Sequence, residues 1–117
     1  EYAESLAEHT NLLVMIADRD TYIAVAGGSK KEYLNKGIGR TVEKSMIDRM
    51  TVLETDGLVE VVEGINSEGA YVIAPIIANG DPIGAVVMVA KEDEALTELE
   101  QKLAETAAGF LARQMEQ

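Results

Sequence analysis

The side chains that most often perform catalysis or hold metal ions are scarce in this chain. It contains no cysteine and one histidine, His9. Disulfides, thiolate zinc sites, iron–sulfur clusters and cysteine nucleophiles are therefore excluded. The chain has no G-x-S-x-G motif, and we expect His9, which precedes Thr10, to be a surface or capping residue rather than a catalyst.

Two other stretches resemble chemical motifs without matching them. Residues 26–31 (AGGSKK) lack the G-x-x-x-x-G-K-[ST] spacing of a phosphate-binding loop, so we interpret them as the exit from a strand. The acidic residues 92–94 are consecutive at a predicted helix start, where carboxylates interact favourably with the helix dipole. The sequence therefore predicts no enzyme, no catalytic residue, no metal site and no cofactor.

Charge is distributed unevenly along the chain. The formal net charge is −11, and such an acidic surface repels phosphate backbones and anionic lipids. We therefore expect this chain to bind neither nucleic acid nor a membrane. Residues 30–50 nevertheless hold six of the ten basic residues against three acidic ones. They form either a solvated loop and helix or an electropositive patch facing a small anionic ligand.

The length and composition indicate one folded domain. The chain has 117 residues, of which 47% are hydrophobic, which is enough for a single core over residues 1–117. No apolar run approaches the roughly 18 residues that suggest a membrane span, and no signal peptide is visible. We expect a cytoplasmic location. Because the first residue is Glu1 rather than Met, we interpret the chain as part of a longer protein.

Hydrophobic periodicity predicts helices at both ends of the chain and strands between them. Pro75 lies inside a predicted strand, where it removes a hydrogen-bond donor, so we expect an edge position or a bulge there. Runs of strands flanked by helices favour an α+β fold with an antiparallel sheet. The predicted elements are a helix at 1–9, strands at 12–17 and 21–25, helices at 31–34 and 41–49 with Thr41 as N-cap, a connector at 50–56, a strand at 58–63, a turn at 64–69, strands at 70–78 and 82–90 around a turn at 79–81, and a helix at 93–116.

The predicted last helix has a wider apolar face than one neighbour needs. Its two adjacent stripes are Leu96, Leu99, Leu103, Ala107 and Phe110, and Ala104, Ala108, Leu111 and Met115. One stripe can lie on the sheet. We expect the other to contact a partner helix, the alternative being that residues 1–9 cover it. The candidate oligomer contacts are Leu6, Leu103, Phe110, Leu111 and Met115.

Several stretches resemble known families. Pro75-Ile76, Gly80 and Ile83-Gly84-Ala85-Val86 resemble the closing hairpin of GAF domains, which are small-ligand sensors related to PAS domains. Residues 17–36, 78–87 and 105–117 are similar to the family of C-terminal domains of stage V sporulation protein T, a transcriptional regulator of spore-forming Firmicutes. The resemblance implies a GAF/PAS-like α+β fold: a five- to six-stranded antiparallel sheet, both terminal helices on one face, and a helical insert after the second strand.

The resemblance also implies a regulatory role in sporulation, as an activator or repressor of transcription. In that family a DNA-binding domain, absent from this chain, precedes the GAF domain. The family also implies dimers, and tetramers of the intact protein, through helical contacts. The GAF domain is expected to sense a small molecule of unknown identity. This sequence lacks the Asn-Lys-Phe-Asp-Glu set associated with cyclic-nucleotide GAF domains, so we do not expect a cyclic nucleotide.

We expect the ligand pocket between the sheet and the insert, with residues 30–58 as its lid. The candidate lining residues are Tyr33, Met46, Arg49, Tyr71 and Pro75. Arg49 lies seven residues after Val42, near the same side of the predicted helix, where its guanidinium would suit an acidic ligand. The alternative for Arg49 is a surface ion pair with Asp48 or Glu54.

A second function is compatible with the same pattern. The domain could be a purely structural dimerisation module whose pocket is filled by Met46, Met50 and Leu53, because methionine fills irregular gaps well. A connected cavity of about 300 Å³ or more beneath the insert would favour sensing over this alternative. A small acid–base enzyme is a third reading, but it would need paired carboxylates in the pocket, and no convincing pair is evident.

Overall fold

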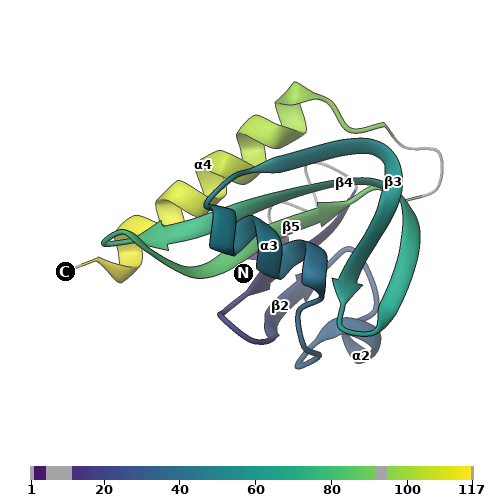
Figure 1. The fold of residues 1–117 in the computed structure, drawn as a ribbon, viewed down its shortest axis with the longest axis horizontal. Helices are drawn as coiled ribbons and strands as arrows, with labels where there is room; N and C mark the ends of the chain where they lie inside the picture. Colours follow the sequence, from purple (N-terminus) through teal and green to yellow (C-terminus); the bar gives the residue numbers. More distant parts are fainter. Residues whose placement is uncertain (1, 5–11, 92–94, 117) are drawn as a thin grey trace.

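The computed structural model describes residues 2–4, 12–91 and 95–116. Five antiparallel strands form one sheet in the order β2-β1-β5-β4-β3. Figure 1 shows the ribbon with helices α2, α3 and α4 around the strands. This confirms the predicted α+β class and the predicted order of elements. Of the predicted helix at 1–9, residues 2–4 are helical and the remainder lies outside the described residues. The elements are β1 (Leu13–Ala17), β2 (Tyr22–Ala26), α2 (Lys30–Tyr33), α3 (Arg40–Asp48), β3 (Val52–Val62), β4 (Ile65–Ala78), β5 (Asp81–Val89) and α4 (Glu98–Met115).

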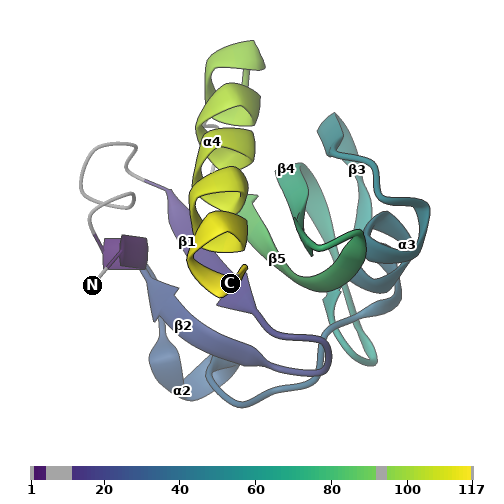
Figure 2. The same ribbon diagram turned by 90° about the vertical axis from the view of Figure 1, so that its left-hand side faces the viewer.

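Both faces of the sheet are covered. Helix α4 lies on one face and helix α3 on the other (Figure 2). All five residues of β1 are buried, as expected for a continuous apolar run in the middle of a sheet. Successive residues of a strand point to opposite faces, so the central strands supply side chains to two separate cores.

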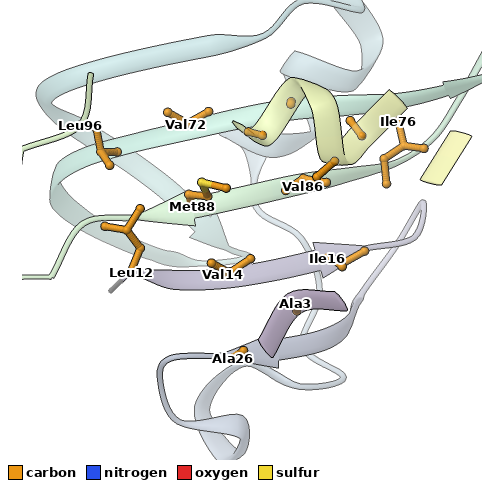
Figure 3. Packing of buried hydrophobic residues seen from close by; sticks show 14 of the residues in the cluster. Ala3, Leu12, Val14, Ile16, Ala26, Val72, Ile76, Val86, Met88 and Leu96 are labelled. Atoms are coloured by element: carbon orange, nitrogen blue, oxygen red, sulfur yellow. The ribbon is translucent and has the colours of Figure 1, made fainter. Parts of the chain in front are cut away.

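The first core lies between the sheet and α4. Val14 of β1, Val72 of β4 and Met88 of β5 point into it from neighbouring strands (Figure 3). Helix α4 faces them with four buried alanines, Ala104, Ala107, Ala108 and Ala112, whose small side chains let the helix approach closely. Ala3 packs into the same core, and Tyr2 stacks on Phe110 with ring centroids 5.3 Å apart. The described terminal segments therefore share one face, as predicted.

The second core lies between the sheet and the insert. Val42 and Met46 of α3 pack there with side chains from the opposite face of the strands. Tyr22 is fully buried in this core, and its hydroxyl donates a hydrogen bond to the carbonyl oxygen of Val61 at 2.6 Å. This bond joins β2 to the far end of β3 across the insert.

The hairpin of β3 and β4 is longer than the sequence predicted. The connector at 50–56 and the turn at 64–69 are wrong, because β3 begins at Val52 and β4 begins at Ile65. The turn between them is centred on Gly64, whose positive φ of 82° suits glycine. Much of the added length is exposed and polar, so its sequence lacks the apolar alternation that marks a half-buried strand.

Two helix starts also differ from prediction. Helix α4 begins at Glu98 rather than at 93, and its N-cap is Thr97, with Glu100 completing a capping box. The acidic residues 92–94 lie outside the described residues. Helix α3 is capped by Gly39 rather than Thr41, and a Cβ at Gly39 would overlap the carbonyl oxygen of Glu60.

Pro75 lies in an interior strand, but its immediate surroundings resemble an edge. The pairing of β3 with β4 starts at Val52 and Ile73, so no β3 residue pairs with Pro75. On the other side it pairs with Ala85, and the register shifts between Ile76 and Ile77. The missing N–H is therefore tolerated where the neighbouring strand has ended and next to an irregularity.

Candidate functional site

A cavity of about 480 Å³ opens at one corner of the molecule, between α2 and the β3–β4 hairpin. We call it the α2 pocket. It exceeds the roughly 300 Å³ typical of the smallest ligand sites. Its lining comes from α2 and the loop after it, from β3 and β4, and from the adjoining ends of β1 and β5. The lining residues, in that order, are Lys31, Glu32, Tyr33, Lys36, Val61, Val62, Ile65, Ser67, Leu13 and Val89.

The loop after α2 holds this corner together on its β2 side. Asn35 has a left-handed conformation with a φ of 67°. Its N–H donates to the Tyr22 carbonyl at 2.9 Å, and the Tyr22 N–H donates to the Lys36 carbonyl at 3.0 Å. Because both bonds involve a buried residue of the sheet, the backbone at Lys36 is fixed beside β2.

The same loop is bonded to the end of β3. The N–H of Glu63 donates to the Gly37 carbonyl at 3.0 Å, and the Gly39 N–H donates to the Val61 carbonyl at 2.8 Å. Ile38 forms an isolated antiparallel bridge with Val62. These contacts fix the hairpin relative to the loop that follows α2, so the two walls of the α2 pocket are held at a defined separation.

The α2 pocket combines an aliphatic interior with a polar rim. Leu13, Val61 and Val62 are buried members of the second core, and half-buried Val89 packs beside them. Lys31 and Lys36 line the rim and are exposed. Apolar walls with a few convergent polar groups are typical of small-molecule sites.

Tyr33 is the one polar residue of the described pocket lining that is half-buried rather than exposed. It packs against the second core. Burial raises the pKa of its phenol, and the charge of Glu32 raises this pKa further. The phenol is therefore neutral at physiological pH and can donate a hydrogen bond.

The structure disperses the five predicted pocket residues. Tyr33 alone lines the α2 pocket. Met46 and Tyr71 are buried in the second core. Pro75 lines a separate groove of about 220 Å³ against α4, on the opposite face of the sheet.

Arg49 does not point under the insert. Helix α3 ends at Asp48, and Arg49 adopts a left-handed conformation with a φ of 55°, so the helical spacing from Val42 does not apply to it. Its Nε donates to the Gly80 carbonyl at 3.1 Å and its Nη1 to the Ile47 carbonyl at 3.3 Å. Neither predicted carboxylate partner is involved.

Arg49 is also far from the α2 pocket. Gly80 precedes β5, whereas the pocket contacts Val89 at its other end. The nine residues of β5 span roughly 26 Å at about 3.3 Å per residue.

Methionine fills only part of the space beneath the insert. Met46 is 5% exposed and occupies the region between α3 and the sheet, but Met50 is 63% exposed. Met50 therefore does not fill the space as the alternative expected, because α3 ends at Asp48 and the chain turns at Arg49. Leu53 packs with the first core, on the other face. The three proposed fillers leave the α2 pocket open.

Most of the pocket lining was not predicted from the sequence. Ile65 and Ser67 fall in the segment interpreted as a turn, so their place in a strand was missed. The excess of basic residues in 30–50 did indicate Lys31 and Lys36, but it did not distinguish them from their neighbours.

The predicted oligomer contacts divide into two groups. Leu103 and Leu111 are partly buried against the first core. Phe110 and Met115 are 41% and 63% exposed, as is Leu99 at 64%. Leu6 lies outside the described residues.

A second, polar groove of about 640 Å³ lies beside the N-terminus of α3. Its Glu60 accepts hydrogen bonds from the backbone N–H groups of Gly64 and Arg40, which hold the pKa of this carboxyl below its usual range. The carboxylate is thus occupied in joining α3 to β3.

Among the described residues, no group of three or more His, Cys, Asp or Glu side chains is placed to hold a metal ion. Within the same residues, no helix is long and apolar enough to cross a membrane.

Similar folds occur in proteins of diverse activity. A type II free methionine-R-sulfoxide reductase from Thermoplasma acidophilum matches with a TM-score of 0.75 and 16% identity, covering 96% of this chain and 85% of that one. Residues 122 to 287 of a methyl-accepting chemotaxis protein match with a TM-score of 0.77 and 18% identity, covering 95% and 82%. At these identities the likeness shows the fold alone, which is GAF-like.

Sequence comparison is more specific. Residues 1–116 match the family described as stage V sporulation protein T C-terminal, transcription factor. Stage V sporulation protein T of Bacillus subtilis (strain 168) is 54% identical over 119 residues. That match covers 100% of this chain but 66% of the relative, so about a third of the relative lies outside it. The chain belongs to the family of stage V sporulation protein T C-terminal domains.

Proposed function

We propose that this chain is the small-molecule-sensing and oligomerising domain of a cytoplasmic sporulation transcription factor. The observation that carries the proposal is the α2 pocket, with its apolar interior and polar rim, in a chain of a transcription-factor family. The intact protein would bind DNA through a domain outside these 117 residues, since the acidic charge of −11 disfavours binding by this one. Ligand binding would then regulate transcription as activation or repression.

A regulatory role is better supported than an enzymatic one. The family description names a transcription factor. The α2 pocket contains one carboxylate, Glu32, and no second acid or histidine that would form an acid–base pair with it among its described lining. The reductase with the similar fold is too distant in sequence to transfer its activity.

The exposed side of α4 supports the oligomerising part of the proposal. Leu99, Leu103 and Phe110 lie within about 40° of one another around the helix axis. Leu99 is 64% exposed, and Phe110 remains 41% exposed although Tyr2 stacks on its ring. An apolar stripe of this kind on a surface helix fits a partner helix. We propose a dimer through the terminal helices, and a tetramer of the intact protein.

A pocket-filling variant tests the sensing function. Ser67 lines the α2 pocket and is exposed, so Ser67→Trp should fill the pocket without disturbing either core. Glu68→Trp is the matched control, because adjacent strand residues point to opposite faces. A metabolite screen by thermal shift should find compounds that stabilise the unmodified domain, by about 2.7 kcal/mol at 100 times the Kd. Their effect should be lost in Ser67→Trp and kept in Glu68→Trp.

Two results would contradict the sensing function. One is equal stabilisation of both tryptophan variants, which would place binding elsewhere. The other is the absence of any stabilising compound, which would favour the purely structural dimerisation module, since that alternative needs the exposed stripe of α4 but no pocket.

A further inference from the structure

The basic residues of the insert differ in what they contact. Lys30 forms an ion pair with Glu4 at 3.8 Å, Arg40 with Glu60 at 3.8 Å, and Lys44 with Asp48 at 2.7 Å. Arg49 donates to backbone carbonyls. The two remaining basic residues of this stretch, Lys31 and Lys36, have no carboxylate within 4.0 Å among the described residues. Both line the α2 pocket.

The rim of the α2 pocket is therefore locally cationic in an acidic protein. Its charged side chains are Lys31, Lys36 and Glu32, an excess of one positive charge. Salt screens exposed charges beyond a Debye length of about 8 Å at physiological ionic strength. Glu63 lies close by, beside Gly37, but does not line the pocket. The two ammonium groups at the rim thus act on a bound molecule more strongly than the acidic residues that lie beyond this distance.

The interior of the pocket limits the body of the ligand. Its apolar lining is aliphatic, from Leu13, Val61, Val62, Ile65 and Val89, and Tyr33 is its one aromatic residue among those described. Nucleobases bind best when stacked on aromatic side chains, and a single phenol at the wall provides little such surface. An aliphatic body matches these walls better than a planar heterocycle.

We infer that the ligand of the α2 pocket is a small aliphatic molecule carrying one anionic head group, a carboxylate or a phosphate. This inference rests on the proposed sensing function. The aliphatic body lies against Val61, Val62 and Val89, and the head group lies at the rim beside Lys31 and Lys36. The neutral phenol of Tyr33 and the hydroxyl of Ser67 supply further hydrogen-bond donors.

Probes that share one body and differ in head group test the inference. Octanoate, octyl phosphate, 1-octanol and octylammonium are titrated into the whole 117-residue chain, with binding followed by amide chemical shifts of the pocket residues. At least one of the two anions should bind about tenfold or more tightly than 1-octanol, as expected for a charge-assisted hydrogen bond. Octylammonium should bind most weakly, and the tighter anion identifies the head group.

Variants assign the preference to the two lysines. The double substitution Lys31→Gln with Lys36→Gln should weaken binding of the anion about tenfold and leave 1-octanol unchanged. Lys44→Gln removes one positive charge from an exposed, already paired lysine of α3 and should change neither. Both positions of the double variant are exposed, so the fold should be retained.

The outcomes separate this inference from the function on which it rests. Equal binding of all four probes, with loss in Ser67→Trp, would overturn the anionic head group while retaining a pocket that binds ligands. Preference for octylammonium would do the same. Anion binding that survives Ser67→Trp would place the site elsewhere and overturn the inference. Absence of binding by these probes and by every compound in the screen would overturn both.

Discussion

The buried hydroxyl of Tyr22 should contribute measurably to stability. Tyr22 is fully buried, and its hydroxyl donates to the Val61 carbonyl at 2.6 Å, so Tyr22→Phe removes one buried hydrogen bond. The Val61 carbonyl also accepts from the Gly39 N–H at 2.8 Å and is not left without a partner. The cost should therefore be the net value of one hydrogen bond, about 1 kcal/mol, rather than the larger penalty for an orphaned buried group.

Chemical denaturation followed by circular dichroism measures this difference. For a domain of this size, about 1 kcal/mol corresponds to a fall in Tm of about 4 °C. Tyr71→Phe is the matched control, because Tyr71 is 5% exposed in the same core and makes no side-chain hydrogen bond among those described. Its free energy of unfolding should change by less than about 0.5 kcal/mol.

Two results would refute the reasoning about Tyr22. If Tyr22→Phe were as stable as Tyr71→Phe, the bond across the insert would contribute nothing. If it cost more than about 3 kcal/mol, the Gly39 N–H would not be satisfying the Val61 carbonyl, and the hairpin end would have shifted. Amide exchange at Gly39 and Glu63, both bonded in the same corner, distinguishes a local opening from a uniform loss of stability.

Two further predictions concern association and pH. Leu99→Glu places a charge on the exposed stripe of α4 and should convert the domain to a monomer in sedimentation experiments. Ile47→Glu, at a similarly exposed position on α3, should leave association unchanged. An unmodified domain that is already monomeric at high micromolar concentration would contradict the proposed dimer. Burial raises the pKa of Tyr22 above its usual value of 10.0. The contribution of Tyr22 to the free energy of unfolding is therefore fully present below pH 10 and should fall as the pH rises through the alkaline range. The free energy of unfolding should fall more steeply with pH in the unmodified domain than in Tyr22→Phe.

The elements predicted best from sequence are those whose position in the sheet dictates their composition. The run over β1 is apolar because both of its faces are covered, and the Asn79-Gly80 turn is marked by two residues that tolerate the positive φ they adopt. The β3–β4 hairpin was underestimated because Thr55 and Asp56 are exposed and carry no pattern. Glu54 and Gly57, on either side of them, pair with Tyr71 and Gly69 of β4, and this pairing rather than local propensity continues the strand across the irregularity.

The candidate site was predicted less well because it depends on where the chain turns. Arg49 was placed near Val42 on helical spacing, but α3 ends one position earlier, at Asp48. Arg49 itself is left-handed, and its side chain donates to Gly80 in the β4–β5 turn. Lys31 and Lys36 acquire their place from the loop that bonds α2 to β2 and β3, and backbone pairing of that kind leaves no periodic signal in the sequence.

The contrast between the two helices of the insert explains why a pocket exists at this corner. Helix α3 buries Val42 and Met46 against the sheet and closes the space beneath itself. Helix α2 has four residues and buries none of them, so its side chains border the sheet corner without filling it. A module kept only for dimerisation would gain stability from a large apolar residue here, because burying apolar surface contributes about 25 cal/mol per Å². At this position the chain instead has lysines and a tyrosine at the rim of an aliphatic recess. The proposed ligand would supply the missing packing there, and its binding free energy would add to the stability of the fold.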